Sequence, residues 1–293
     1  MDATRLRLLS AGLDYVTCTA KVGPARDGLR QLGDAILLEE QRAGNARRGA
    51  DWKGYRLERS GQASVGSRPQ DVMLSLSGHA AYTYGPAALA LADHASRTDL
   101  QLTMHSPRWD VAHLIRAAMY QPSAIARQGR PIARQYIDSS DAGSTCYLGS
   151  PRSDQRGRFY DKGKESPEEY DAGSARLEVQ YRKAAADAVR EEYRAGTMTP
   201  RRIAGTVATW FQSRGVLTEV RLPVGDPIKP PARDETDYER HRRWLRESVA
   251  PAIRRWRHVA PPRAVLYDLG IDEWGDILDD EPETDPDDAR GHV

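Results

Sequence analysis

Cysteine is scarce in this sequence, and its scarcity excludes two kinds of architecture. The 293 residues include two cysteines, Cys18 and Cys146, and each lies in an apolar, strand-like run. One pair cannot build a disulfide framework, and a four-cysteine zinc site is excluded by the count. We expect both thiols to be reduced and buried.

Long apolar runs are missing as well. No stretch of about 18 apolar residues occurs, and no basic start is followed by an apolar segment. We therefore expect neither a membrane span nor a signal peptide, no membrane partner, and a cytoplasmic protein.

Several catalytic signatures are absent too. The sequence has no phosphate-binding Gly-x-x-x-x-Gly-Lys-Ser/Thr loop, no Gly-x-Ser-x-Gly elbow and no His-Glu-x-x-His pair. Its seven histidines include no His-hydrophobe-His triplet. These absences argue against a nucleotide-driven motor, a common hydrolase and a metal site built on paired histidines.

Neither sign of charge is in clear excess over the whole chain. There are 43 Lys and Arg residues against 42 Asp and Glu, a formal net charge of +1. The segment 276–288 (DILDDEPETDPDD) is strongly acidic, so the remainder forms a basic body. Arginine supplies nearly all of the positive charge, which suits phosphate binding but is equally compatible with a genomic bias.

The residues that are present alternate between strand-like and helix-like patterns, which predicts an α+β fold. Period-two patterns and apolar helical spacing define the expected elements. The expected strands are 13–19, 54–58, 63–66, 71–77, 97–104, 145–148, 158–162 and 175–182, and the expected helices are 24–43, 86–94, 109–120, 183–194 and 199–212. In 97–104 one face is polar and the other apolar.

The segment 156–162 (RGRFYDK) is the most informative for chemistry. Strand alternation places Arg156, Arg158, Tyr160 and Lys162 on one side, away from Phe159. A tyrosine among cations can attack a DNA phosphate and keep the bond energy in a covalent link. The same pattern is also typical of an ordinary surface or partly buried tyrosine.

Two acidic residues occupy the polar faces of alternating strands. If the strands of Asp99 and Glu178 are neighbours, their carboxylates could converge on one divalent ion. Ordinary pairing with Arg97, Arg176 or Arg182 would explain the same acids.

Taken in order, four segments resemble the trans-acting replication-initiation factor family of rolling-circle plasmids and phages, which includes relaxases of some conjugative elements. They are 13–17 (LDYVT), 74–78 (LSLSG), 97–100 (RTDL), and the run from 147–150 (YLGS) through 158–163 (RFYDKG) to 176–178 (RLE). The last run is the specific one, because its hairpin and two strands follow in fixed sequence.

The resemblance implies an antiparallel central sheet with flanking helices, as in tyrosine nicking endonucleases. It implies Tyr160 as the nucleophile and Lys162 and Arg158 as phosphate partners. It also implies that a divalent metal ion, Mg²⁺ or Mn²⁺, is held by Asp99 and Glu178, with Asp14 as an addition. Family members often carry a second acid four residues after the Asp of Arg-x-Asp, where this chain has Thr103, so the ligand set departs from the pattern.

The resemblance spans roughly residues 10–215, and composition divides the rest of the chain. We expect a catalytic nicking domain over 1–215, a Pro-rich connector over 216–235, an accessory helical segment over 236–274 and an acidic, disordered tail over 275–293. Arginines at 240–257 and at Arg47 and Arg48 are candidates for origin binding, and a merely solvated surface is an equal alternative.

The function implied is rolling-circle replication initiation: metal-dependent, site-specific nicking and rejoining of one DNA strand through a 5′-phosphotyrosine intermediate. The expected partners are single-stranded or hairpin origin DNA and a separate host or element-encoded helicase, and a homodimer is compatible with the sequence. The alternatives are a conjugative relaxase with the same chemistry and a catalytically inactive DNA-binding regulator.

Overall fold

The computed structural model describes residues 6–21, 23–120, 133–139, 143–226, 228 and 244–245, and it confirms the predicted α+β class. Its strands are β1 (Arg7–Ala20), β2 (Arg48–Trp52), β3 (Tyr55–Ser60), β4 (Ala63–Arg68), β5 (Asp71–Ser77), β6 (His94–His105), β7 (Arg134–Ile137), β8 (Thr145–Leu148), β9 (Gln155–Asp161) and β10 (Ser174–Arg182). Its helices are α1 (Pro24–Arg42), α2 (Gly78–Leu91), α3 (Val111–Tyr120), α4 (Lys162–Glu165), α5 (Ala184–Arg194) and α6 (Pro200–Gln212).

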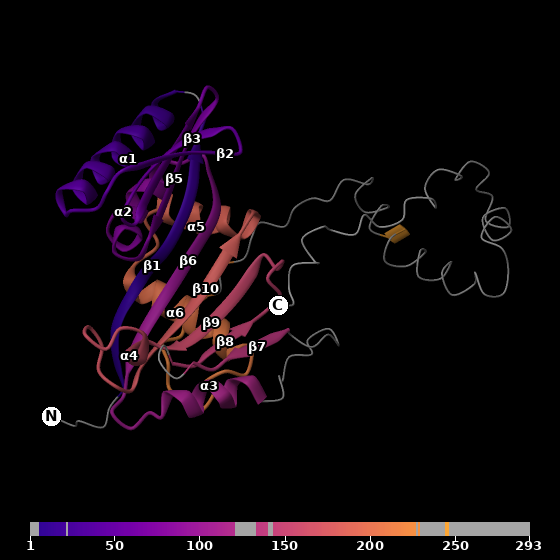
Figure 1. The fold of residues 1–293 in the computed structure, drawn as a ribbon. Helices are drawn as coiled ribbons and strands as arrows, with labels where there is room; N and C mark the ends of the chain where they lie inside the picture. The colour runs from indigo at the N-terminus through magenta and orange to yellow at the C-terminus, as the bar shows by residue number, and fades with distance from the viewer. Residues whose placement is uncertain are drawn as a thin grey trace, which may run out of the picture. The chain divides into compact units, whose positions relative to one another are not determined.

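The described strands form one antiparallel sheet. Their order is β2-β3-β4-β5-β1-β6-β10-β9-β8-β7, so the early meander and the late hairpins extend from opposite sides of the long β1–β6 pair (Figure 1). Strand β10 follows β6, which makes β1, β6 and β10 neighbours at the centre of the sheet. The strands that carry Asp99 and Glu178 are therefore neighbours, which the sequence alone left open.

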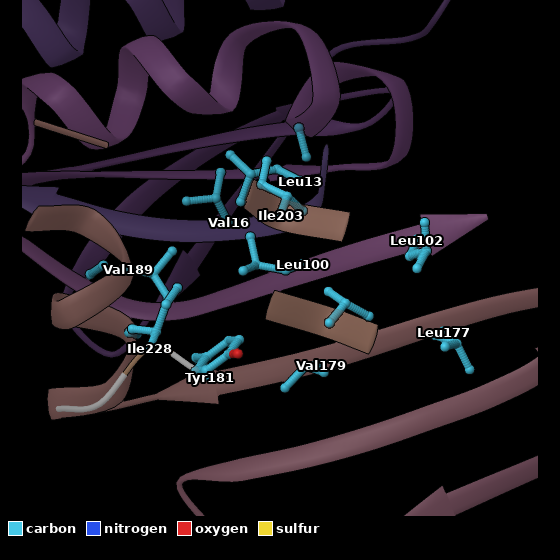
Figure 2. Packing of buried hydrophobic residues seen from close by; sticks show 14 of the residues in the cluster. Leu13, Val16, Leu100, Leu102, Leu177, Val179, Tyr181, Val189, Ile203 and Ile228 are labelled. Carbon is cyan, nitrogen blue, oxygen red and sulfur yellow. The ribbon is translucent and has the colours of Figure 1, made fainter. Parts of the chain in front are cut away.

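One face of the sheet is apolar. As the alternation in 97–104 predicts, Thr98, Leu100, Leu102 and Met104 are fully buried. Leucines and valines of β1 and β10 continue this face, and Val189 of α5 and Ile203 of α6 belong to the same cluster (Figure 2). Burial of this apolar area is the main force holding the helices to the sheet.

The opposite face is polar because alternate residues of the same strands project there. Register sets its rows across the central strands. One row contains Tyr15, Asp99, Gln180 and Arg156, and the row nearest the end of β9 contains Thr103, Arg176, Tyr160 and Thr145. This polar face carries the candidate site.

Helix α6 packs closely on β9. A Cβ atom on Gly157 would lie 2.4 Å from the Trp210 ring and 2.9 Å from the Phe211 ring. The absence of a side chain at Gly157 therefore allows the helix to approach the strand that carries Tyr160.

Several predicted elements need correction. Helix α2 begins at Gly78, directly after β5, and contains Pro86 as an interior residue instead of starting there. Strands β2 and β7 were not predicted. Lys162 is not a strand residue: β9 ends at Asp161, whose side chain accepts a hydrogen bond from the Lys164 amide and starts α4 at Lys162.

The described core belongs to a first unit, Met1–Pro231, and the remainder of the chain is assigned to a second. In the first unit Val216, Leu217, Leu222 and Ile228 are buried, so part of the segment expected as a connector packs in the core. The expected accessory segment lies outside the described residues apart from 244–245, and the acidic tail lies wholly outside them.

Both cysteines are free and buried, as expected. Among the described helices, none combines the length and the apolar character needed to cross a membrane.

Candidate active site on the polar face of the sheet

Tyr160 of β9 lies on the polar face with its hydroxyl group directed at a carboxylate. The side chain is 3% exposed, and its hydroxyl donates a hydrogen bond to Glu178 Oε1 on the neighbouring strand β10, at 2.6 Å. Burial and the negative charge of Glu178 raise the pKa of Tyr160 above its ordinary value. The phenol is therefore protonated at neutral pH and needs a proton acceptor to become a nucleophile.

Glu178 has the properties of such an acceptor. Burial, followed by the negative charge of Asp14, raises the pKa of Glu178 to about 7, while Arg158 acts in the opposite direction. A carboxylate with a pKa near neutrality is a stronger base than an ordinary surface glutamate. The Tyr160–Glu178 hydrogen bond thus joins a candidate nucleophile to a candidate base.

Arg158 contacts both members of this pair. Its guanidinium lies over the Tyr160 ring, 3.9 Å from the ring centroid, and its Nη1 is 3.7 Å from Glu178 Oε2. It also reaches Glu165 of α4, at 3.3 Å. A half-exposed guanidinium over the tyrosine ring is suitably placed to attract a phosphate.

Lys162 reaches the site indirectly, through Glu165. Its ammonium group contacts Glu165 at 2.7 Å and Ser166 at 3.0 Å, so Glu165 links it to Arg158. The structure therefore brings the three predicted cations only partly to Tyr160. Arg158 contacts its ring, whereas Arg156 stacks on Tyr147, 4.1 Å from the ring centroid.

Arginines engage the two remaining candidate acids. Asp99 accepts two hydrogen bonds from Arg97, one of them at 2.9 Å from Nε, and Asp14 accepts one from Arg176 at 3.1 Å. The sequence left open whether the acids face arginine or a metal, and in the described part of the chain the arginine contacts are present.

The donor chemistry of these acids nevertheless suits a divalent cation. Burial raises the pKa of Asp99, and the negative charge of Asp14 contributes to the raised pKa values of both Asp99 and Glu178. Carboxylate oxygens are the ligands that Mg²⁺ and Mn²⁺ prefer. Within the described ranges, however, no three acid, histidine or cysteine side chains are arranged to hold an ion. Both oxygens of Asp99 accept from Arg97, so coordination by Asp99 would require Arg97 to release it.

Arg176 is a site residue whose role was missed by sequence reasoning. It is 8% exposed and donates to Thr103 Oγ1 at 2.8 Å and to the Tyr170 hydroxyl at 3.1 Å, besides Asp14. Thr103 stands where members of the family that the sequence resembles often have an acid. Here it accepts a hydrogen bond from Arg176. Strand alternation placed Arg176 on the face of Glu178, but burial of an arginine is not visible in a sequence.

The fold defines a class: a large antiparallel sheet with an apolar face covered by helices and a polar face bearing a buried tyrosine–carboxylate pair. A solved structure similar to this chain is a rolling-circle replication initiator protein from Geobacillus stearothermophilus, with a TM-score of 0.50 and 16% sequence identity. The match covers 81% of this chain and 91% of that one. At this identity the likeness concerns the fold. No protein-family model and no curated protein matches the sequence.

Proposed function

We propose that this protein is a rolling-circle replication initiator that nicks and rejoins one strand of origin DNA with Tyr160 as the nucleophile. The observation that carries the proposal is the 2.6 Å hydrogen bond between the Tyr160 hydroxyl and Glu178 beneath the Arg158 guanidinium. The shared fold with a rolling-circle initiator supports the choice of DNA as substrate.

In the proposed reaction Tyr160 transfers its proton to Glu178 as its oxygen attacks the phosphorus atom. A bond forms between the phenolic oxygen and phosphorus, and the bond from phosphorus to the 3′ oxygen breaks. A proton from solvent completes the free 3′-hydroxyl, and the 5′ phosphate remains on Tyr160. Arg158 offsets the charge that develops on the phosphate, with Lys162 as a second phosphate partner. Rejoining reverses these steps.

The proposal includes a divalent cation, Mg²⁺ or Mn²⁺, held by Asp99 and Glu178 with Asp14 in addition. Such an ion would withdraw charge from the phosphate when bound. Its binding can be measured without any cleavage assay. We expect Mn²⁺ to raise the melting temperature of the wild-type protein and to leave that of Asp99→Asn unchanged, and equal shifts in the two proteins would remove Asp99 from the ligand set.

A strand-specific cleavage assay tests the nucleophile. Purified protein is incubated with Mn²⁺ and labelled single-stranded oligonucleotides that tile the origin region of its replicon, and products are separated on a denaturing gel. We expect a covalent protein–DNA adduct that Tyr160→Phe abolishes. Tyr147→Phe is the matched control, since Tyr147 is a half-buried tyrosine of the adjacent strand with Arg156 over its ring. An adduct that survives in Tyr160→Phe would refute the assignment.

The same assay separates the alternatives. Cleavage at a transfer origin instead of a replication origin would identify a conjugative relaxase, and binding without cleavage on a verified origin would identify an inactive regulator. Because the sequence has no phosphate-binding motor loop, the proposal assigns duplex unwinding to a separate helicase. A homodimer remains part of the proposal and is tested by sedimentation.

A further inference from the structure

The polar face has a concave region over strands β1 to β5, three or more strands away from Tyr160 in the sheet order. It is a groove of about 350 Å³ lined in part by Tyr15, Trp52, Leu57 and Met73. Leu57 and Met73 form a small buried apolar cluster with Tyr55, separate from the main core. Trp52 is 44% exposed. The groove therefore combines an apolar floor with an accessible aromatic ring.

Three hydroxyl groups gather at the side of the groove nearest the centre of the sheet. The Tyr15 hydroxyl is 2.8 Å from Ser75 Oγ, Thr17 Oγ1 is 3.0 Å from the same atom, and Thr17 Oγ1 donates to the Tyr15 hydroxyl at 3.2 Å. All three residues are half-buried. Hydroxyl groups both donate and accept hydrogen bonds, so this triangle can bind the polar edge of a planar ligand resting on the apolar floor.

Two arginines stand side by side at the outer end of the groove. Arg48 and Arg59 are directly opposite each other in the β2–β3 pair, both are exposed, and both line an adjoining hollow of about 370 Å³. Within the described chain neither has an ion-pair partner. Like charges directly opposite each other across a ladder destabilise it, and a bound anion would relieve that repulsion.

Arg97 links the groove to the candidate active site. The Arg97 guanidinium lies over the Tyr15 ring, 4.0 Å from the centroid, and the same guanidinium binds Asp99. Tyr15 and Asp99 are direct partners in the β1–β6 ladder. A chain of nucleotides crossing the polar face from Tyr160 would thus reach Tyr15 and then the arginine pair.

We propose that this groove is a binding site for single-stranded DNA that continues across the polar face from the candidate active site. A nucleobase stacks on Trp52 above the apolar floor and contacts the hydroxyl triangle, while Arg48 and Arg59 hold the backbone phosphates. An aromatic platform beside unpaired cations is the general arrangement for binding single strands. The proposal rests on the proposed function for the position of the cut, but the groove's binding chemistry is independent of cleavage.

Fluorescence anisotropy with fluorescein-labelled dT20 tests the site in the full-length protein, with Tyr160→Phe as the background to exclude cleavage. We expect Trp52→Ala to weaken binding roughly tenfold through lost stacking. We expect the double variant Arg48→Ala/Arg59→Ala to weaken it and to lower the salt slope by about 0.7 for each lost phosphate contact. Arg56→Ala is the matched control. Arg56 is an exposed arginine of β3, and because successive strand residues face opposite sides, it projects from the face opposite to Arg59.

Photocrosslinking locates the contact directly. A dT20 strand with 5-iodo-deoxyuridine near one end should crosslink to the peptide that contains Trp52, and the crosslink should be lost in Trp52→Ala. Crosslinks confined to other peptides, or equal losses of affinity in Arg56→Ala and Arg48→Ala/Arg59→Ala, would overturn the groove assignment.

The two proposals fail in different ways. If the groove variants lose dT20 binding but no Tyr160-dependent adduct forms on origin DNA, the groove is supported and the nicking function is wrong. If the adduct forms and the groove variants bind dT20 as tightly as the Arg56→Ala control, the nicking function is supported and the groove is not the DNA site.

Discussion

At the scale of single residues, the site depends on a glutamate whose charge is costly in the folded protein. Glu178 is buried on β10 between the Tyr160 hydroxyl and Arg158, and its pKa is raised to about 7. In an unfolded chain a glutamate titrates near 4.3. The folded state therefore holds the proton to higher pH than the unfolded state does.

This difference predicts a pH-dependent stability. Because the folded pKa is above the unfolded one, the stabilisation is complete below about pH 4 and is lost as the pH rises through 7, by roughly 4 kcal/mol in total. We expect the metal-free wild type to lose unfolding free energy between pH 5 and 8 relative to Glu178→Gln, which cannot titrate. Urea unfolding of both proteins across this range measures the difference, and parallel pH profiles would contradict it.

The residue scale also shows how far sequence reasoning reached. Arg158 and Tyr160 were predicted to lie on one side of their strand, and Asp99 and Glu178 on the polar faces of theirs. The register places all four on one face of the sheet. Their roles remain proposals. The contacts of Arg176 with Asp14 and Thr103 could not be predicted, because they depend on β1, β6 and β10 being adjacent, which pattern within one strand does not specify.

At the scale of elements, the contact between α6 and β9 should be sensitive to a single methyl group. A Cβ at Gly157 would lie within 3 Å of Trp210 and Phe211. We expect Gly157→Ala to lower the unfolding free energy by about 1–3 kcal/mol through overpacking, measured by urea unfolding. Gly49→Ala is the control, since the nearest atom to its new Cβ would be the Leu57 carbonyl oxygen at 3.9 Å. Equal effects of the two substitutions would mean that the α6–β9 packing is not the cause.

The elements missed by sequence analysis share a physical reason. Strand β2 (RGADW) is exposed along its whole length, and β7 (RQYI) has four residues, so neither carries the apolar alternation that signals a half-buried strand. Helix α2 was expected over about residues 86–94, beginning at Pro86. Its alanine-rich preceding turns are helical instead and are buried through Ala80 and Ala81.

At the scale of the whole molecule, the boundary of the folded body can be tested by truncation. Val216, Leu217, Leu222 and Ile228 are buried in the unit Met1–Pro231. A chain ending at residue 231 keeps these side chains, whereas one ending at residue 215 loses all four. At about 1.5–3 kcal/mol for each fully buried large apolar side chain, the shorter chain should be several kcal/mol less stable.

Calorimetry of the two truncated chains measures this difference. We expect the 1–231 chain to unfold in one cooperative transition and the 1–215 chain to melt at a clearly lower temperature. Equal melting temperatures would place the end of the folded body at residue 215.

The position of Tyr160 within a regular strand, paired with β8 on one side and β10 on the other, has a consequence for turnover. Ladder hydrogen bonds on both sides hold the backbone of Tyr160 in place, so that it cannot move from one substrate to another. If Tyr160 cuts DNA, the nucleic acid must bring each phosphate to a stationary oxygen. Supercoiling of the duplex, which favours strand separation, would then govern the rate on double-stranded DNA, while short single strands would react at a rate independent of topology.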